Sequence, residues 1–296
     1  VKFISKTFST RNGFDNSDLD FASNFNIVYK KSREKWVFFL KNYFERFYDF
    51  DVENADLFFT SGRNEFRTKG IDVYVNALGR LNSKLKIEKE KGISNKKVVS
   101  LFMIPIGNFD KDLSLLYALN TPNFKRNVNW NFAPLSTHSV DMNNEYIQAF
   151  IRAGLKNQDT DSVKVILIPV YLNGNDGILD MSYYDGLLGL DLGVFASYYE
   201  PWGYTPLECI SYGIPSVTSN LSGFGRAILK DYRDVNYGVK ILNRMDKNDD
   251  VIVFELSEYL YDFLLKKREE LLEEKTKIRT FGKEFSWDRF YINYIK

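Results

Sequence analysis

The feature that most constrains the fold is an alternation of short apolar runs with helical patterns along the 296-residue chain. The run VKVILIPV, at 163–170, is apolar at nearly every position rather than at every second one, which is typical of a strand buried on both faces. Six such runs predict strands at 57–60, 98–105, 163–169, 192–196, 215–218 and 237–242. Helical patterns occur between them at 69–85, 142–155, 204–212 and 224–230. This alternation indicates an α/β fold with a parallel sheet and helices on both faces.

Further helical patterns flank this core. One lies within 17–48, and its apolar stripe consists of Trp36, Phe39, Leu40, Tyr43 and Phe44. Near the other end we expect a single long charged helix at 250–277 and a separate amphipathic carboxyl-terminal helix within 279–296. Residues 1–16 have the character of an extended linker. We therefore expect one domain over 1–296.

Composition narrows the functional classes. The balance of 40 basic and 39 acidic residues argues against a nucleic-acid partner, because such proteins concentrate positive charge. No apolar run approaches the roughly 18 residues of a membrane span, and the first residues lack an apolar signal core. The single cysteine, Cys209, excludes an intramolecular disulfide and suits a reducing compartment. We expect a soluble cytoplasmic protein without a membrane partner.

The segment SYYEPWGYTPLECISYGIPSVTSNLSGFG, at 197–225, follows a predicted strand directly. Thr205 as the N-cap, with proline next and Glu208 at the third helical position, predicts a helix start there. Gly203 allows the backbone to approach a ligand, and the amides of the helix start offer an anion site above the strand end. The same spacing also suits a purely structural interpretation, in which Glu208 completes a capping box and Glu200 is a solvated loop acid.

The literal residues favour the functional interpretation. EPWGYTP at 200–206, with Glu208 and the downstream SGFG at 222–225, closely resembles the signature of the eukaryotic-type glycogen synthases. SGRNEFRTKG at 61–70 resembles a donor-binding segment of that family, and PLSTH, IRAGLKN and VKVILIP match in order. NGFD at 12–15 resembles the linker into the second domain. The resemblance covers nearly the whole chain and implies one Rossmann-like half of a GT-B glycosyltransferase, the carboxyl-terminal donor-binding half.

The resemblance also implies catalytic roles for three residues. Arg63 and Lys69 would bind the donor diphosphate, with Asn64 standing where the family usually has tyrosine. A guanidinium and an ammonium suit a diphosphate whose negative charge grows as the glycosidic bond breaks. Glu200 would orient the transferred glucose through its hydroxyls.

Further donor contacts follow from the same resemblance. Glu208 would hold the ribose, and Tyr183 would stack on the base, although the adjacent Tyr184 is an alternative. The remaining candidates are backbone and loop positions near the phosphate or the sugar: Gly203, Tyr204, Thr205, Ser222, Gly223 and Gly225.

The implied reaction is retaining transfer of glucose from UDP-glucose to the non-reducing end of an α-1,4-glucan, without a metal or other cofactor. The glucan would bind through the amino-terminal acceptor half, which this sequence does not contain, so we expect the isolated chain to be inactive. One alternative is a related glycosyltransferase that uses ADP-glucose or another acceptor. The other is a non-catalytic module that binds a nucleotide or a glucan.

Two features point toward metal or base catalysis and have structural explanations. Asp159 and Asp161 match the D-x-D pattern of metal-dependent glycosyltransferases, but their place between a helix and a strand predicts a polar turn. His138 is the only histidine, so it cannot form a histidine metal cluster. The arginine-rich helix through which the family senses glucose 6-phosphate is poorly matched, with Lys275 and Arg279 among a few scattered basic residues, and we expect no comparable activation.

Overall fold

The computed structural model describes residues 11–15, 25–121, 131–232 and 238–291. Its centre is one six-stranded sheet in which all neighbouring strands are parallel, in the order β3-β2-β1-β4-β5-β6. The strands are β1 Asp56–Ser61, β2 Val98–Met103, β3 Val163–Ile168, β4 Leu192–Val194, β5 Ser216–Ser219 and β6 Val239–Leu242. This is the doubly wound order of dinucleotide-binding folds, and it confirms the predicted Rossmann-like sheet. Tyr237, where the sixth strand was expected to begin, lies outside the described residues.

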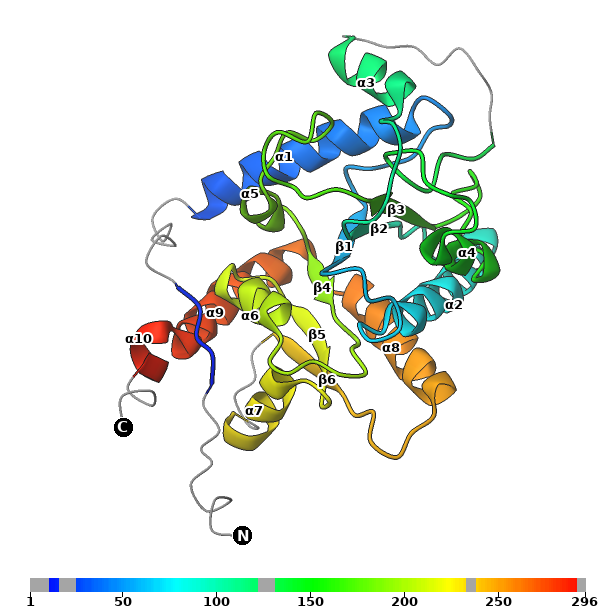
Figure 1. Cartoon of the computed structure of the whole chain (residues 1–296). Helices are drawn as coiled ribbons and strands as arrows, with labels where there is room; N and C mark the ends of the chain where they lie inside the picture. Colours follow the sequence, from blue (N-terminus) through cyan, green and yellow to red (C-terminus); the bar gives the residue numbers. More distant parts are fainter. Residues whose placement is uncertain (1–10, 16–24, 122–130, 233–237, 292–296) are drawn as a thin grey trace.

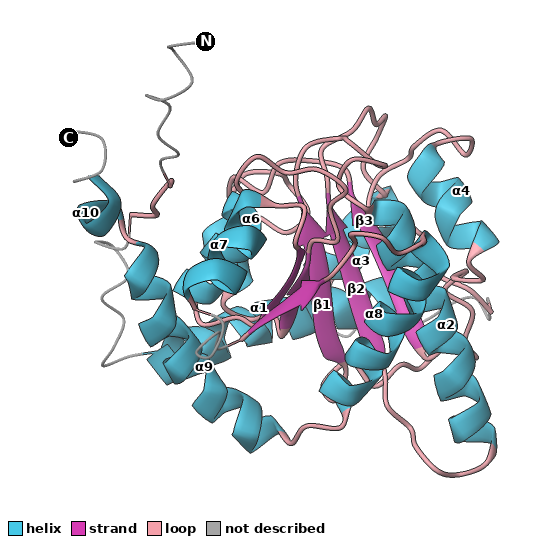
Figure 2. Cartoon of the chain, turned by 90° about the horizontal axis from the view of Figure 1, so that it is seen from below, coloured by secondary structure: helices cyan, strands magenta, loops and turns pink. Residues whose placement is uncertain are grey.

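Helices cover both faces of the sheet (Figures 1 and 2). They are α1 Phe25–Phe44, α2 Ile71–Glu90, α3 Leu113–Asn120, α4 Glu145–Arg152, α5 Tyr183–Leu187, α6 Tyr204–Ser211, α7 Gly223–Asp231, α8 Asp249–Leu264, α9 Arg268–Gly282 and α10 Trp287–Phe290. On one face α2, α4 and α8 share a core with Phe58 of β1, and on the other the stripe of α1 shares a core with Leu57 and Phe59. Successive strand residues point to opposite faces, so β1 contributes to both cores.

The prediction of one long helix at 250–277 is wrong, because the chain forms two helices, α8 and α9, with a break after Leu264. Helix α8 packs against α2, whereas α9 packs against α6 in a third core cluster with α7 and α10. The break between α8 and α9 allows the chain to pass from its contact with α2 to its contact with α6. The carboxylate of Glu270 accepts a 3.4 Å hydrogen bond from the Lys267 amide and so caps the new helix.

The predicted carboxyl-terminal helix within 279–296 is also corrected. Helix α9 continues to Gly282, a 3₁₀ turn spans Lys283–Phe285, and α10 is a short helix after it. Phe14 pairs with this end of the chain, since its amide donates to the carbonyl of Phe285 at 2.9 Å. Residues 1–10, 16 and 292–296 lie outside the described residues.

Two short helices, α3 and α5, were not predicted, and helix α5 is important because it carries Tyr183. The Ser182 side chain caps it by accepting a hydrogen bond from the Asp185 amide.

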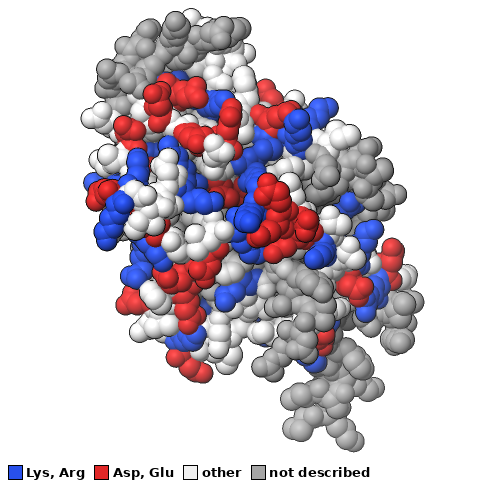
Figure 3. Space-filling view, turned by 180° about the vertical axis from the view of Figure 1, so that it is seen from behind, with Lys and Arg blue, Asp and Glu red and all other residues white. Residues whose placement is uncertain are grey.

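On the outside of the molecule, basic and acidic side chains are interspersed over the face seen from behind (Figure 3). Neither sign of charge dominates that face.

Candidate functional site

A narrow cleft lies where β1, β4 and β5 reach their carboxyl ends. It is lined by Thr60, Ser61, Lys69, Phe195, Ser197, Glu200, Gly203, Thr205, Pro206 and Thr218. The strand order reverses between β1 and β4, and open parallel sheets bind ligands at such a switch point. The free volume is about 10 Å³, which is room for about one water molecule.

Lys69 and Glu200 meet in this cleft. The Lys69 ammonium forms an ion pair with Glu200 Oε2, and each side chain is only 19% exposed. Two backbone contacts bring the segments together. The Tyr198 amide donates to the Thr68 carbonyl at 2.9 Å, and Gly70 lies so close to Ala196 that a Cβ on it would be 1.8 Å from the Ala196 oxygen. Gly70 also has φ +68°, which favours glycine.

The start of helix α6 borders the same cleft, but the predicted N-cap is wrong. Gly203, with φ 108°, is the N-cap residue, and the helix begins at Tyr204. Thr205 and Pro206 are therefore the second and third helical residues. Proline is tolerated there because amides of the first turn have no intrahelical acceptor. The expected placement of a helix amino terminus over the strand ends is nevertheless correct, since Gly203 and Thr205 line the cleft.

Glu208 lies in the second turn of α6, and its carboxylate is held by two tyrosines. The hydroxyls of Tyr183 and Tyr184 donate to its two carboxylate oxygens, each at 3.3 Å. The Tyr183 hydroxyl also lies 2.9 Å from Ser61 Oγ, which connects Glu208 to the end of β1. Burial raises the pKa of Glu208, and the two tyrosine hydroxyls counteract that rise. Partial burial of the Tyr184 hydroxyl and the charge of Glu208 raise the pKa of Tyr184 to about 12.

The two tyrosines present different surfaces. The hydroxyl of Tyr183 is directed at Glu208 and Ser61, whereas Tyr184 is 43% exposed and stacks on Tyr212 with ring centroids 5.5 Å apart. Stacking of Tyr183 on a base stays a prediction. Of the two rings, that of Tyr184 is the more exposed.

The loop at 222–225 contacts the backbone around Glu200 and Pro201, and it does not line the cleft. Ser222 Oγ accepts a 2.9 Å hydrogen bond from the Gly225 amide and caps α7, and the Gly223 amide donates to the Glu200 carbonyl at 3.0 Å. A Cβ on Gly223 would lie 2.2 Å from the Pro201 oxygen. Only glycine therefore permits this close approach behind Glu200.

Arg63 does not line the cleft. Its side chain is 76% exposed and pairs with Glu65 at 3.0 Å. Sequence reasoning placed Arg63 with Lys69 and Glu200, and the structure brings only the latter two together. The sequence analysis did not predict Ser61 and Thr218, which also line the cleft. The rule that ligands bind beyond the carboxyl ends of strands was sufficient to find them.

The features set aside in the sequence have structural roles. Asp161 is buried and binds Asn82 at 3.1 Å, Lys86 at 2.7 Å and the Gln158 amide at 2.8 Å, which completes the predicted turn. His138 is buried and its Nδ1 lies 2.9 Å from Thr137 Oγ1. Within the described ranges, no three His, Cys, Asp or Glu side chains gather as a metal-binding group. No helix in the described part of the chain is both long and apolar enough to cross a bilayer.

Comparison with known proteins agrees with the geometry. The chain is 30% identical to glycogen [starch] synthase of Neurospora crassa, in an alignment that covers 96% of this chain and 47% of that protein. It is also 30% identical to glycogen [starch] synthase isoform 2 of Saccharomyces cerevisiae, covering 92% of this chain and 46% of that protein. The chain thus spans about half the length of the curated relatives it matches.

A solved structure shares the fold. The trehalose-6-phosphate phosphatase N-terminal domain of Candida albicans has a TM-score of 0.53 at 14% identity, over 97% of this chain and 48% of that one. The family model described as glycogen synthase matches residues 7–116 and 124–296. The residues that line the cleft lie within these matched ranges. This chain belongs to the glycogen synthase family.

Proposed function

We propose that this chain is the donor-binding, carboxyl-terminal half of a glycogen synthase. The complete enzyme would transfer glucose from UDP-glucose to the non-reducing end of an α-1,4-glucan, with retention of configuration. The observation that carries this proposal is the meeting of Lys69 and Glu200 at the strand switch point, beside the amino terminus of α6. A cation and a helix start suit a diphosphate, and a neighbouring carboxylate suits sugar hydroxyls.

Donor binding requires the cleft to open. Because a sugar nucleotide is much larger than the present free volume, Lys69 and Glu200 must separate. The diphosphate would then replace Glu200 as the partner of Lys69, which leaves the Glu200 carboxylate for glucose hydroxyls. Arg63 is exposed, and exposed ion pairs such as its contact with Glu65 are weak, so it can turn toward the diphosphate.

Glu208 is suited to hold the ribose. Each of its oxygens accepts one tyrosine hydroxyl, and an ionised carboxylate has about four acceptor positions, so capacity remains for the ribose hydroxyls. The base would lie near Tyr183 and Tyr184. The two cations, Lys69 and Arg63, would neutralise the leaving diphosphate, and we therefore propose that no metal ion is required.

The acceptor would bind to the other half of the enzyme, and closure of the two halves would complete the site. We accordingly propose that these 296 residues alone bind the donor weakly and transfer little glucose. The single, buried cysteine is consistent with a role in the cytoplasm.

The test is an assay of the complete gene product with glycogen and either UDP-glucose or ADP-glucose, with and without EDTA. We expect transfer from UDP-glucose that EDTA does not reduce. Preference for ADP-glucose would identify a related transferase, and donor binding without transfer would identify a non-catalytic module. Loss of activity with EDTA would refute the metal-independent mechanism.

Lys69→Ala tests the site itself. Removal of one preorganised group that stabilises developing charge typically lowers kcat by about 100- to 1000-fold, and we expect a loss of that size. The matched control is Lys84→Ala, which removes a lysine from a remote ion pair with Glu258 at 3.0 Å. Equal activity of the two variants would place the donor phosphates elsewhere.

A further inference from the structure

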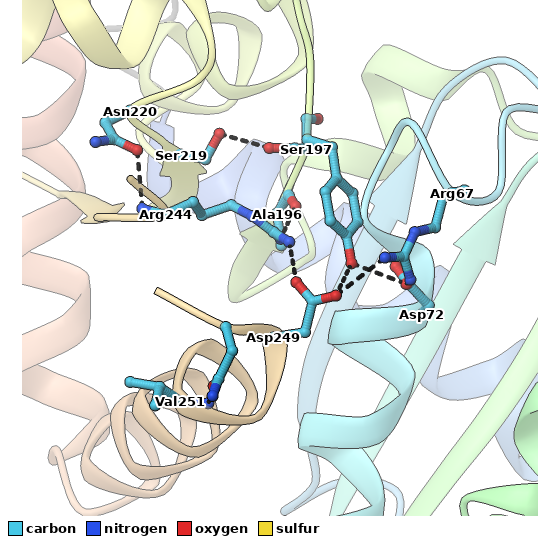
Figure 4. A network of polar contacts seen from close by, with 11 residues as sticks. Arg67, Asp72, Ala196, Ser197, Ser219, Asn220, Arg244, Asp249 and Val251 are labelled. Atoms are coloured by element: carbon cyan, nitrogen blue, oxygen red, sulfur yellow. Dashed lines mark hydrogen bonds and ion pairs between the residues drawn. The ribbon is translucent and has the colours of Figure 1, made fainter. Parts of the chain in front are cut away.

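Figure 4 shows a network of polar contacts that includes Arg67, Asp72, Arg244 and Asp249, and none of these four residues lines the cleft. The centre of the network is Asp249, at the start of α8, whose two oxygens bind Arg244 Nη2 at 2.7 Å and Arg67 Nη2 at 3.0 Å. Arg67 also pairs with Asp72, in the first turn of α2. The network therefore connects the loop that carries Lys69 to the amino termini of two helices.

Tyr198 links these groups. Its hydroxyl oxygen lies 2.6 Å from Asp249 Oδ2 and 3.0 Å from Asp72 Oδ2, and its one hydrogen can be donated to only one of them at a time. The guanidinium carbons of Arg67 and Arg244 lie over its ring, 4.3 and 3.7 Å from the centroid. These are cation–π distances. Burial and the hydrogen bond to Asp249 raise the pKa of the Tyr198 hydroxyl, so it remains a donor at neutral pH.

The backbone on either side of this network carries the proposed donor ligands. The Tyr198 amide binds the carbonyl of Thr68, which directly precedes Lys69. Arg244 Nη1 donates at 2.8 Å to the Ala196 carbonyl, the same oxygen against which Gly70 lies. The segment 196–200 ends at Glu200. The network thus holds together the two backbones from which Lys69 and Glu200 project.

We propose that Tyr198 is a positioning residue for the nucleotide-sugar donor. With Arg67, Arg244 and Asp249 it holds the loop 62–70 against the segment 196–200, so that the two backbone segments stay in place when the side chains of Lys69 and Glu200 separate. This inference rests on the proposed function of the cleft. The network itself combines two guanidiniums with two carboxylates, so it offers no excess positive charge for a phosphate, and it does not line the cleft.

The test compares Tyr198→Phe with Tyr261→Phe in the complete gene product. Tyr261 is a matched control, because it is also half-buried, its hydroxyl donates to a carboxylate at 2.7 Å (Glu88), and a cation lies over its ring (Lys84, 3.6 Å). The measurements are the Kd for UDP-glucose by calorimetry, the KM for donor and for glycogen, and the Tm. A displacement of a site residue by about 1 Å can lower the reaction rate by about 100-fold. For the loss of the single Tyr198 hydroxyl we expect a smaller effect, about a tenfold rise in the Kd and KM for the donor.

The supporting result is a donor-specific effect. Tyr198→Phe should leave the KM for glycogen unchanged. Tyr261→Phe should lower the Tm about as much as Tyr198→Phe does, without altering the Kd for UDP-glucose. If Tyr198→Phe binds UDP-glucose as tightly as the unaltered protein, the inference is refuted while the proposed function stands. If the unaltered protein binds no UDP-glucose, both fail. Should Tyr198→Phe not fold, Asp249→Asn is measured instead, with the same expected rise in Kd and the same contradiction if Kd is unchanged.

Discussion

The two edges of the sheet carry similar networks in different settings. At the carboxyl edge, Asp249 and Asp72 pair with two arginines, one of which, Arg67, is largely exposed. At the amino edge, Asp191 directly precedes β4 and is buried among cations that belong to α1 and α9. Its partners there are Arg33 at 2.6 Å and Arg268 at 3.1 Å.

The amino-edge network holds the fold together. Arg33 and Arg268 come from helices at opposite ends of the chain, and the Leu57 amide of β1 also donates to Asp191, at 2.8 Å. The arginines keep the pKa of Asp191 low although burial opposes this, whereas burial and the charge of Asp191 raise the pKa of Asp56. The two networks combine the same types of charged group and differ in place: one is anchored on the buried Asp191 at the amino edge, and the other lies at the carboxyl edge, the side on which open parallel sheets bind ligands.

The largest expected effect lies at the amino edge. Asp191→Asn removes the buried charge that the buried Arg33 and the partly exposed Arg268 share, and breaking a buried pair typically costs about 3–5 kcal/mol. We expect a loss of that size in the free energy of unfolding, measured by urea denaturation. Glu284→Gln, which breaks the exposed pair with Arg289, is the control and should cost at most about 1 kcal/mol. Similar losses for both variants would show that the buried network at Asp191 contributes no more to stability than an exposed ion pair.

The same network predicts a pH dependence. Lys275 is buried, its ammonium donates to the Leu190 carbonyl at 2.8 Å, and burial lowers its pKa from 10.5 to about 8. Between these two pH values the unfolded chain binds more protons than the folded chain, so the Lys275 contribution makes stability rise with pH in this window. Relative to Lys275→Met, the unaltered protein should gain on the order of 3 kcal/mol from pH 8 to pH 10.5. A constant difference between the two proteins in urea denaturation would contradict this.

The smallest of these effects in free energy lies at the carboxyl edge and concerns activity. Gly70→Ala places a methyl group on the Ala196 carbonyl and should displace Lys69, which lowers donor-dependent activity of the complete enzyme by about 100-fold. Gly92→Ala is a matched control, because Gly92 has a similar φ of +67° with no atom within 4 Å of the added Cβ. It should lose stability but not activity. Equal activities would show that the close approach at Gly70 does not position the site.

Much of the fold could be predicted because its signals are local. The six strands, the stripe on α1 and the existence of helices α6 and α7 follow from the periodicity of apolar residues. The break between α8 and α9 could not be found in this way, because the sequence there remains helix-compatible and only packing on two different parts of the core separates the helices. Gly203 is the N-cap instead of Thr205 because the chain enters the helix with φ +108°, a backbone conformation that favours glycine.

For the site, the sequence by itself determined which chemical groups are present and that they follow strand ends, since both depend only on neighbouring residues. Tertiary structure alone decided that Lys69 contacts Glu200 across 131 positions, that Arg63 points outward, and that Lys275, one of the scattered basic residues, is an internal hydrogen-bond donor. Contacts between distant segments depend on how helices and strands pack, and a local pattern carries no information about that packing.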